Sequence, residues 1–172
     1  MKNVYLKISA FIILAVFCTA TFAQVNKQIQ WRKNYGGGGE DFPGTVVNTF
    51  DGGYIYCATT YSDDQDVHGL HGGSSSDVWL VKINSVGDTQ WTKTYGGTGA
   101  EWGKAIIQTP DSGFVFVADA QSNDGDLDTN YGSWDVWVVK LDKTGAIQWQ
   151  KDFGGSGYEE VTSIYRHADG SY

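Results

Sequence analysis

Short apolar runs separated by turns are the main pattern of this chain after its first segment. Within residues 104–153, four such runs follow one another, separated by two short turns and one long polar loop. In the last run, apolar Ile147 and Trp149 alternate with polar Gln148 and Gln150, which is the period of a strand with one buried face. The predicted strands cover residues 104–109, 114–120, 136–141 and 146–153.

The same pattern recurs along the chain. Trp31, Trp91 and Trp149 each open a Trp-x-Lys-x-Tyr/Phe-Gly-Gly segment, at spacings of 60 and 58 residues. An Asp-x-x-Tyr/Phe turn and an Asp-Val-Trp-x-Val-Lys strand recur between these segments. Four antiparallel strands per repeat of this length fit one blade of a β-propeller. We therefore expect an all-β fold of four-stranded antiparallel propeller blades, incomplete at about two and a half repeats.

The domain organisation follows from these landmarks. Residues 1–23 begin with Lys2 and Lys7, continue as an apolar run too short to span a bilayer, and end at Ala23, which predicts a secretory signal peptide. Residues 24–172 are predicted to be a partial propeller, and we expect the chain to be the N-terminal fragment of a larger protein. Its predicted parts are an outer strand at 29–35, a blade at 44–95, a blade at 103–153 and the start of a third blade at 160–172.

Charge narrows the range of partners. The chain has 20 Asp and Glu against 12 Lys and Arg, a formal net charge of −8. A negative surface repels phosphate backbones and anionic headgroups. We expect no nucleic-acid partner and no membrane insertion once the signal segment is removed.

The repeated motifs resemble a known family. The cycle of Trp-x-Lys-x-Tyr/Phe-Gly-Gly, Asp-Gly-Gly-aromatic, Ser-x-Asp-Gly-Asp and Asp-x-Trp-x-Val-Lys is similar to secreted β-propeller repeat proteins of Bacteroidota, and to the broader SBBP-type propeller repeats. The resemblance spans residues 30–172. It implies an extracellular or surface protein, often with a C-terminal sorting domain for type IX secretion. The first copy departs from the pattern, because Gln65 stands where the family has glycine.

One loop carries oxygen-bearing side chains at alternate positions, as calcium loops do. Thr129 occupies the place of the glycine that an EF-hand needs, so the loop is not an EF-hand. The alternative is a turn whose acids bond nearby backbone amides. The candidate calcium ligands are Asp124, Asp126, Asp128, Asn130 and Asp135.

The tryptophans divide into two groups. Trp102 and Trp134 have no counterparts in the other copies, and we expect them to be exposed and to contact a ligand. The others recur in register and are assigned to sheet packing: Trp31, Trp79, Trp91, Trp137 and Trp149.

Other reactive groups have a structural interpretation. Asp77 and Asp135 recur, which favours a role in capping a loop or bonding backbone amides. Cys57 lies in an apolar run and is interpreted as a small buried hydrophobe. His68 and His71 are too loosely spaced to favour a zinc site.

No residue is identified as catalytic. Adjacent acids such as Glu159 and Glu160 point to opposite faces of a strand, whereas glycosidases need two carboxyl groups facing each other. The sequence therefore favours a secreted or cell-surface module that binds or scaffolds, with an extracellular polysaccharide or surface protein as partner. Two alternatives stay open: part of an endoglucanase-like propeller hydrolase or lyase, and a calcium-stiffened, adhesin-like structural protein.

Overall fold

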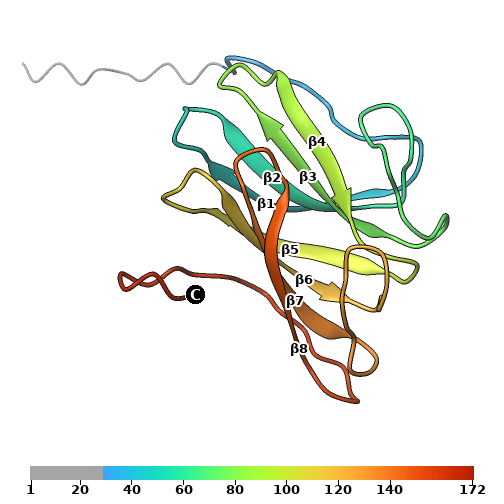
Figure 1. The fold of residues 1–172 in the computed structure, drawn as a ribbon. Helices are drawn as coiled ribbons and strands as arrows, with labels where there is room; N and C mark the ends of the chain where they lie inside the picture. The colour runs from blue at the N-terminus through green and yellow to red at the C-terminus, as the bar shows by residue number, and fades with distance from the viewer. Residues whose placement is uncertain (1–28) are drawn as a thin grey trace, which may run out of the picture. The chain divides into compact units, whose positions relative to one another are not determined.

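Two four-stranded antiparallel sheets make up the fold (Figure 1). The computed structural model describes residues 29–172, and the predicted signal peptide at 1–23 lies outside them. These residues contain no helix, so the predicted all-β class is confirmed. Sheet one has the order β1 (Asp41–Asn48), β2 (Tyr54–Thr60), β3 (Asp77–Ile83) and β4 (Thr89–Tyr95). Sheet two repeats it with β5 (Glu101–Gln108), β6 (Phe114–Ala120), β7 (Asp135–Leu141) and β8 (Ile147–Phe153).

The strand boundaries agree closely with the apolar runs of the second copy. β6 has the predicted limits, β7 begins one residue earlier, and β8 begins one residue later than predicted. β5 begins three residues before its predicted start, because Glu101 already pairs with Ala120. A register shift between Gly103 and Ala105 then bends this strand.

Two predicted segments do not form strands. Residues 29–35, predicted as an outer strand, are not assigned to a strand, and this prediction is not confirmed. A strand needs a hydrogen-bonded neighbour, and no strand in residues 29–172 pairs with this segment. Residues 160–172 also contain no strand, although they close the expected turn: the His167 amide donates to the Ser171 carbonyl at 2.8 Å, as Thr109 does to Gly113 at 2.9 Å.

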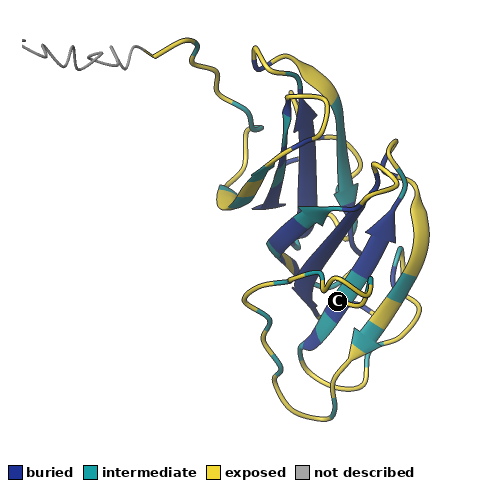
Figure 2. Ribbon diagram, turned by 90° about the vertical axis from the view of Figure 1, so that its left-hand side faces the viewer, coloured by how far each residue is buried: buried dark blue, intermediate teal, exposed yellow. Residues whose placement is uncertain are grey.

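The main core lies between the two sheets. Strand alternation turns Ile55 and Leu80 of sheet one toward Phe116 and Trp137 of sheet two. Trp137 and Phe116 are completely buried, and Figure 2 shows the central strands as the most buried of each sheet. Burial of such apolar area is the dominant stabilising contribution.

The opposite face of sheet one is covered by the N-terminal segment. Trp31 and Tyr35 pack against a cluster that includes Trp79. The Trp31 ring lies 6.2 Å from the Tyr54 ring, and the Tyr35 hydroxyl donates to the Gly87 carbonyl at 2.5 Å.

The same packing recurs at the other two copies of the motif. Trp91 of β4 lies 6.0 Å from Phe114 of β6, and the Tyr95 hydroxyl donates to the Gly145 carbonyl at 2.7 Å. Trp149 of β8 lies 6.2 Å from Tyr172. Each Trp-x-Lys-x-Tyr/Phe segment therefore packs against the Asp-x-x-Tyr/Phe turn of the following copy. Trp149 is nevertheless 40% exposed and Ile147 36% exposed, so the predicted buried face of this strand is not buried here.

A buried lysine fastens that turn to its own sheet. Lys82 is 5% exposed, and its Nζ donates to Asp51 Oδ2 at 2.9 Å and to Gln90 at 2.7 Å. Hydrogen bonds from the Thr49 hydroxyl and from Lys82 lower the pKa of Asp51 to about 2. Lys140 makes the same contact with Asp111 at 2.8 Å, which explains why the lysine recurs in this strand motif.

Candidate ligand-binding face

A glycine-rich link precedes the first strand of each sheet, and a third link follows β8. Link one is residues 36–39, link two is residues 96–99, and link three is residues 154–157. In link two, four successive backbone amides donate to side chains of the following strand and of the acidic loop at 122–126. The four pairs are Gly96 with Asp126 (3.2 Å), Gly97 with Glu101 (3.0 Å), Thr98 with Asp124 (2.8 Å) and Gly99 with Ser122 (2.8 Å).

Link one is held in the same way by the acidic loop at 62–66. Gln65 stands where the second copy has Gly125, but it adopts φ +56°, close to the φ of +68° at Gly125. The departure at Gln65 therefore leaves the loop conformation intact. The four pairs are Gly36 with Asp66 (3.3 Å), Gly37 with Asp41 (2.9 Å), Gly38 with Asp64 (2.6 Å) and Gly39 with Ser62 (3.0 Å).

These contacts account for two of the five predicted calcium ligands, since Asp124 and Asp126 bind link two. The side-chain amide of Asn130 donates to the Ala120 carbonyl at 3.1 Å. Asp128 is exposed, and Asp135 accepts a hydrogen bond from the backbone amide of Tyr131. Within residues 29–172, no three His, Cys, Asp or Glu side chains form a group arranged to hold a metal ion. The five do not surround one point, and the turn interpretation fits Asp124 and Asp126.

Asp77 and Asp135 occupy matched, buried positions at the starts of β3 and β7. Asp77 Oδ2 accepts from the His71 backbone amide at 2.9 Å and contacts His71 Nδ1 at 2.7 Å. Burial raises the pKa of Asp77 to about 6, against the lowering effect of the His71 hydrogen bonds. The predicted role of these residues in bonding loop amides is confirmed.

Asp152 of β8 is a further acid with a perturbed environment. Burial raises its pKa to about 6, and the negative charges of Asp135 and Asp128 act in the same direction. The Thr129 hydroxyl donates to Asp152 Oδ2 at 3.0 Å. Asp152 does not stand out in the sequence, because the matching residue of the first copy is Thr94.

The histidine and cysteine positions agree with their structural interpretation. Burial is the largest influence on the pKa of His71 and lowers it, but the hydrogen bond to Asp77 together with the negative charges of Asp77, Asp126 and Glu101 gives a net rise. Cys57 is completely buried, and burial raises the pKa of its thiol to about 12. A thiol that stays protonated is a poor nucleophile.

Trp102 and Trp134 come together, although 32 positions separate them in the sequence. Their ring centroids are 5.6 Å apart in an edge-to-face arrangement. Trp102 is 43% exposed, as predicted, whereas Trp134 is half-buried. Tyr158 extends the contact on the other side of Trp134, at 6.1 Å. The backbones of Trp134 and Tyr158 also form an isolated parallel bridge.

A second aromatic pair lies beside Trp102. Phe42 and Tyr61 are both exposed and stack edge-to-face at 6.2 Å. With Trp102, Gly103 and Lys104 they line a groove of about 280 Å³. We refer to Phe42, Tyr61, Trp102, Trp134 and Tyr158 as the aromatic row.

Polar groups border the aromatic row. Lys104 Nζ lies 5.5 Å from the Trp102 ring and forms ion pairs with Asp119 at 2.8 Å and Glu160 at 3.0 Å. Glu40 also lines the groove. The row thus combines largely exposed rings with an ion-paired lysine and a carboxylate, a composition suited to a polyhydroxylated ligand.

Sequence reasoning found two of the five aromatic residues. Phe42 holds the position in β1 that Trp102 holds in β5, so the repeat alignment contains a signal for it. Tyr61 and Tyr158 lie just outside strands, and their place in the row depends on how the segments fold back.

A scan against protein-family models and a search of curated proteins find no match to this chain. A helix able to cross a membrane is absent from residues 29–172.

Proposed function

We propose that this chain is a secreted or surface-exposed β-propeller repeat module, of the kind found in the Bacteroidota proteins it resembles, and that it binds a neutral extracellular polysaccharide. The aromatic row is the binding face in this proposal. The observation that carries it is the contact at 5.6 Å between Trp102 and Trp134, the two tryptophans that do not belong to the repeat.

The recurring contacts between successive copies support the propeller part of the proposal. Trp31, Trp91 and Trp149 each meet the aromatic residue of the following turn at 6.0 to 6.2 Å. A contact that recurs at each copy is what an array of blades requires, since each blade must cover the next.

The chemistry of the row supports carbohydrate as the ligand. Aromatic rings present apolar faces to the C–H groups of a pyranose ring, and neighbouring polar groups bond its hydroxyls. The net charge of −8 disfavours acidic polysaccharides, because like charges repel at the approach. A neutral chain of sugars therefore fits better than a uronate polymer.

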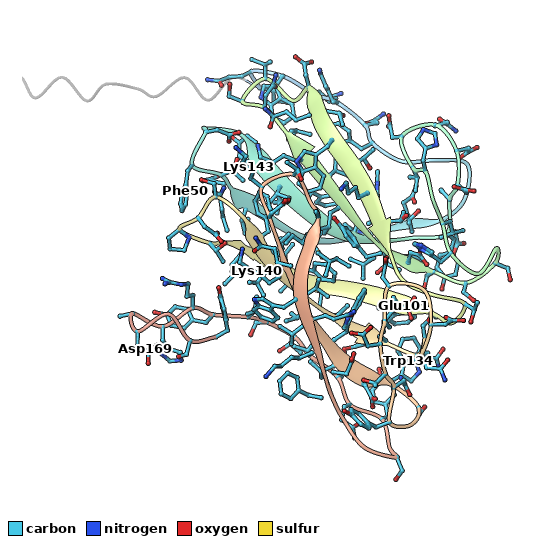
Figure 3. The ribbon with its side chains drawn as sticks, in the orientation of Figure 1. Phe50, Glu101, Trp134, Lys140, Lys143 and Asp169 are labelled. Carbon is cyan, nitrogen blue, oxygen red and sulfur yellow. The ribbon has the colours of Figure 1, made fainter. Side chains whose placement is uncertain are left out.

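Affinity electrophoresis in gels that contain neutral polysaccharides tests the proposal. We expect retardation of the wild-type protein and its loss in Trp102→Ala and Trp134→Ala. Phe50→Ala is the matched control. Phe50 is an aromatic residue that is 70% exposed, and it lies well apart from Trp134 in Figure 3. Unchanged retardation in both tryptophan variants would exclude the row, and release of reducing sugar would favour the hydrolase alternative.

A further inference from the structure

The two buried aspartates that begin β3 and β7 each leave one oxygen without a partner. Asp77 is 0% exposed and Asp135 is 1% exposed. In both, Oδ2 accepts a backbone amide from the preceding loop, donated by His71 or by Tyr131. Oδ1 of each is buried and accepts no hydrogen bond.

Each unpartnered oxygen faces a second carboxylate across a link glycine. A Cβ placed on Gly154 would lie 2.0 Å from Asp135 Oδ1 and 2.8 Å from Glu159 Oε2. A Cβ placed on Gly96 would likewise lie 2.6 Å from Asp77 Oδ1 and 2.5 Å from Glu101 Oε2. The absence of a side chain at these glycines makes room for two acidic groups, which repel each other unless a positive charge is near.

The first copy supplies that positive charge from its own chain. His71 Nδ1 lies 2.7 Å from Asp77 Oδ2, and the residue diagonal to Asp77 on β4 is Thr94. Thr94 is uncharged, and its hydroxyl donates to the Gly69 carbonyl at 2.7 Å. The first copy is therefore internally compensated.

The second copy has lost the cation and gained an anion. Tyr131 makes the backbone contact that His71 makes in the first copy, and Asp152 stands in place of Thr94. Asp152 pairs with Trp137, so it lies on the same face as Asp135 and diagonal to it. Asp152 Oδ1 is also buried without a partner. Among the ion pairs of residues 29–172, none involves Asp135, Asp152 or Glu159.

We propose that a hydrated divalent cation binds between Asp135 Oδ1 and Asp152 Oδ1 and supplies the positive charge that His71 supplies at Asp77 Oδ2 in the first copy. Carboxylate oxygens suit Ca²⁺ and Mg²⁺, and a site with two carboxylates is completed by water. This site differs from the predicted calcium loop, because Asp124 and Asp126 are occupied by the amides of link two. It is independent of the aromatic row.

Thermal melting of the purified protein in 5 mM CaCl₂, 5 mM MgCl₂ or a chelator provides the test. With a dissociation constant of order 0.1 mM, we expect a divalent cation to raise Tm by about 5 °C. Asp152→Thr, which copies the first repeat, should abolish the rise. Asp126→Asn is the control and should retain it.

A second variant and a direct measurement keep the test decisive. Tyr131→His supplies the cation of the first copy and should raise Tm in the chelator while removing the response to Ca²⁺. Titration calorimetry with CaCl₂ should show one site in the wild-type protein and none in Asp152→Thr. No Tm rise with either metal, or a rise that persists in Asp152→Thr, would overturn the proposal.

Discussion

The Tyr95 hydroxyl donates a hydrogen bond to the Gly145 carbonyl at 2.7 Å and so joins the last strand of sheet one to the last hairpin of sheet two. Tyr35 makes the same bond with Gly87 at 2.5 Å from outside any strand. The third copy has Phe153 at this position and therefore has no hydroxyl to donate. This hydrogen bond recurs in the first two copies. Its contribution to stability can therefore be measured by removing it at one copy and then at the other.

Tyr95→Phe should lower the free energy of unfolding by about 1–2 kcal/mol, because it leaves the buried Gly145 carbonyl without a donor. Tyr35→Phe should cost less, since Tyr35 is only partly buried. Urea denaturation of both variants measures the difference. Equal, negligible losses would show that the bond contributes nothing at either copy.

Glycine should be the favoured residue at the left-handed position of both acidic loops. The left-handed φ of +56° at Gln65 is sterically strained. The loop of Gln65 also lies farther from its link, because the Asp66 N to Gly36 O distance is 3.4 Å and the Asp126 N to Gly96 O distance is 2.9 Å. Gln65→Gly should stabilise the protein by about 0.5–1 kcal/mol, the strain relieved less the added freedom of the unfolded chain.

Gly125→Ala is the reciprocal change. A Cβ at Gly125 would lie 2.4 Å from the Gly96 carbonyl oxygen, at φ +68°. We expect a loss of about 2 kcal/mol or more, from backbone strain together with the clash. Thermal melting of both variants gives the signs, and a stabilised Gly125→Ala would contradict the assignment of this loop.

Stability should be highest in mild acid. Asp77 has a folded pKa of about 6, above its ordinary value, so its stabilising contribution is complete below pH 4 and is lost as the pH rises through 6. The raised pKa of His71 acts with the same sign. Asp51, with a pKa lowered to about 2, contributes stability that is present above pH 4 and is lost as the pH falls toward 2.

Urea midpoints at pH 3, 5 and 8 measure this profile, and the midpoint at pH 5 should be the highest. Asp77→Asn should flatten the limb between pH 5 and 8, because the amide keeps an acceptor for His71 without a charge to bury. A wild-type midpoint that increases steadily from pH 5 to 8 would contradict the account of Asp77.

Cys57 should be chemically inert in the folded protein. It is completely buried and its thiol pKa is raised to about 12, so the thiolate that attacks disulfide reagents is scarce. In a Cys18→Ser background, an aromatic disulfide reagent should label less than a tenth of the protein within minutes, and all of it in guanidinium. Rapid labelling of the native protein would show that sheet one opens readily.

The parts of the fold set by local pattern were predictable. β6 is an apolar run between Gly113 and Gln121 that only Asp119 interrupts, and its limits match the prediction. The start of β5 was missed because Glu101 is charged and Trp102 precedes a glycine, so they look like a link. Only the tertiary structure, in which Glu101 accepts the Gly97 and Ser122 amides, shows how a buried acid is accommodated there.

The candidate site was predictable in two of its five members but not in its geometry. Trp102 and Trp134 stand out because they interrupt the repeat, yet their contact depends on loop 121–134 folding back over β5. Within its own strand, Asp152 belongs to the polar set of alternating residues, so the sequence predicts a solvent-facing side chain there. It becomes notable only through its diagonal neighbour Asp135, which belongs to a different part of the sequence.

The most direct test of the central claim is a titration followed by nuclear magnetic resonance at the indole N–H groups of the seven tryptophans. A neutral oligosaccharide of the polymer that retards the protein is the titrant. The account predicts saturable shifts at Trp102 and Trp134, with Trp79 and Trp137 unmoved inside their sheets. Shifts absent at Trp102 and Trp134, while other indoles respond to the sugar, would contradict it.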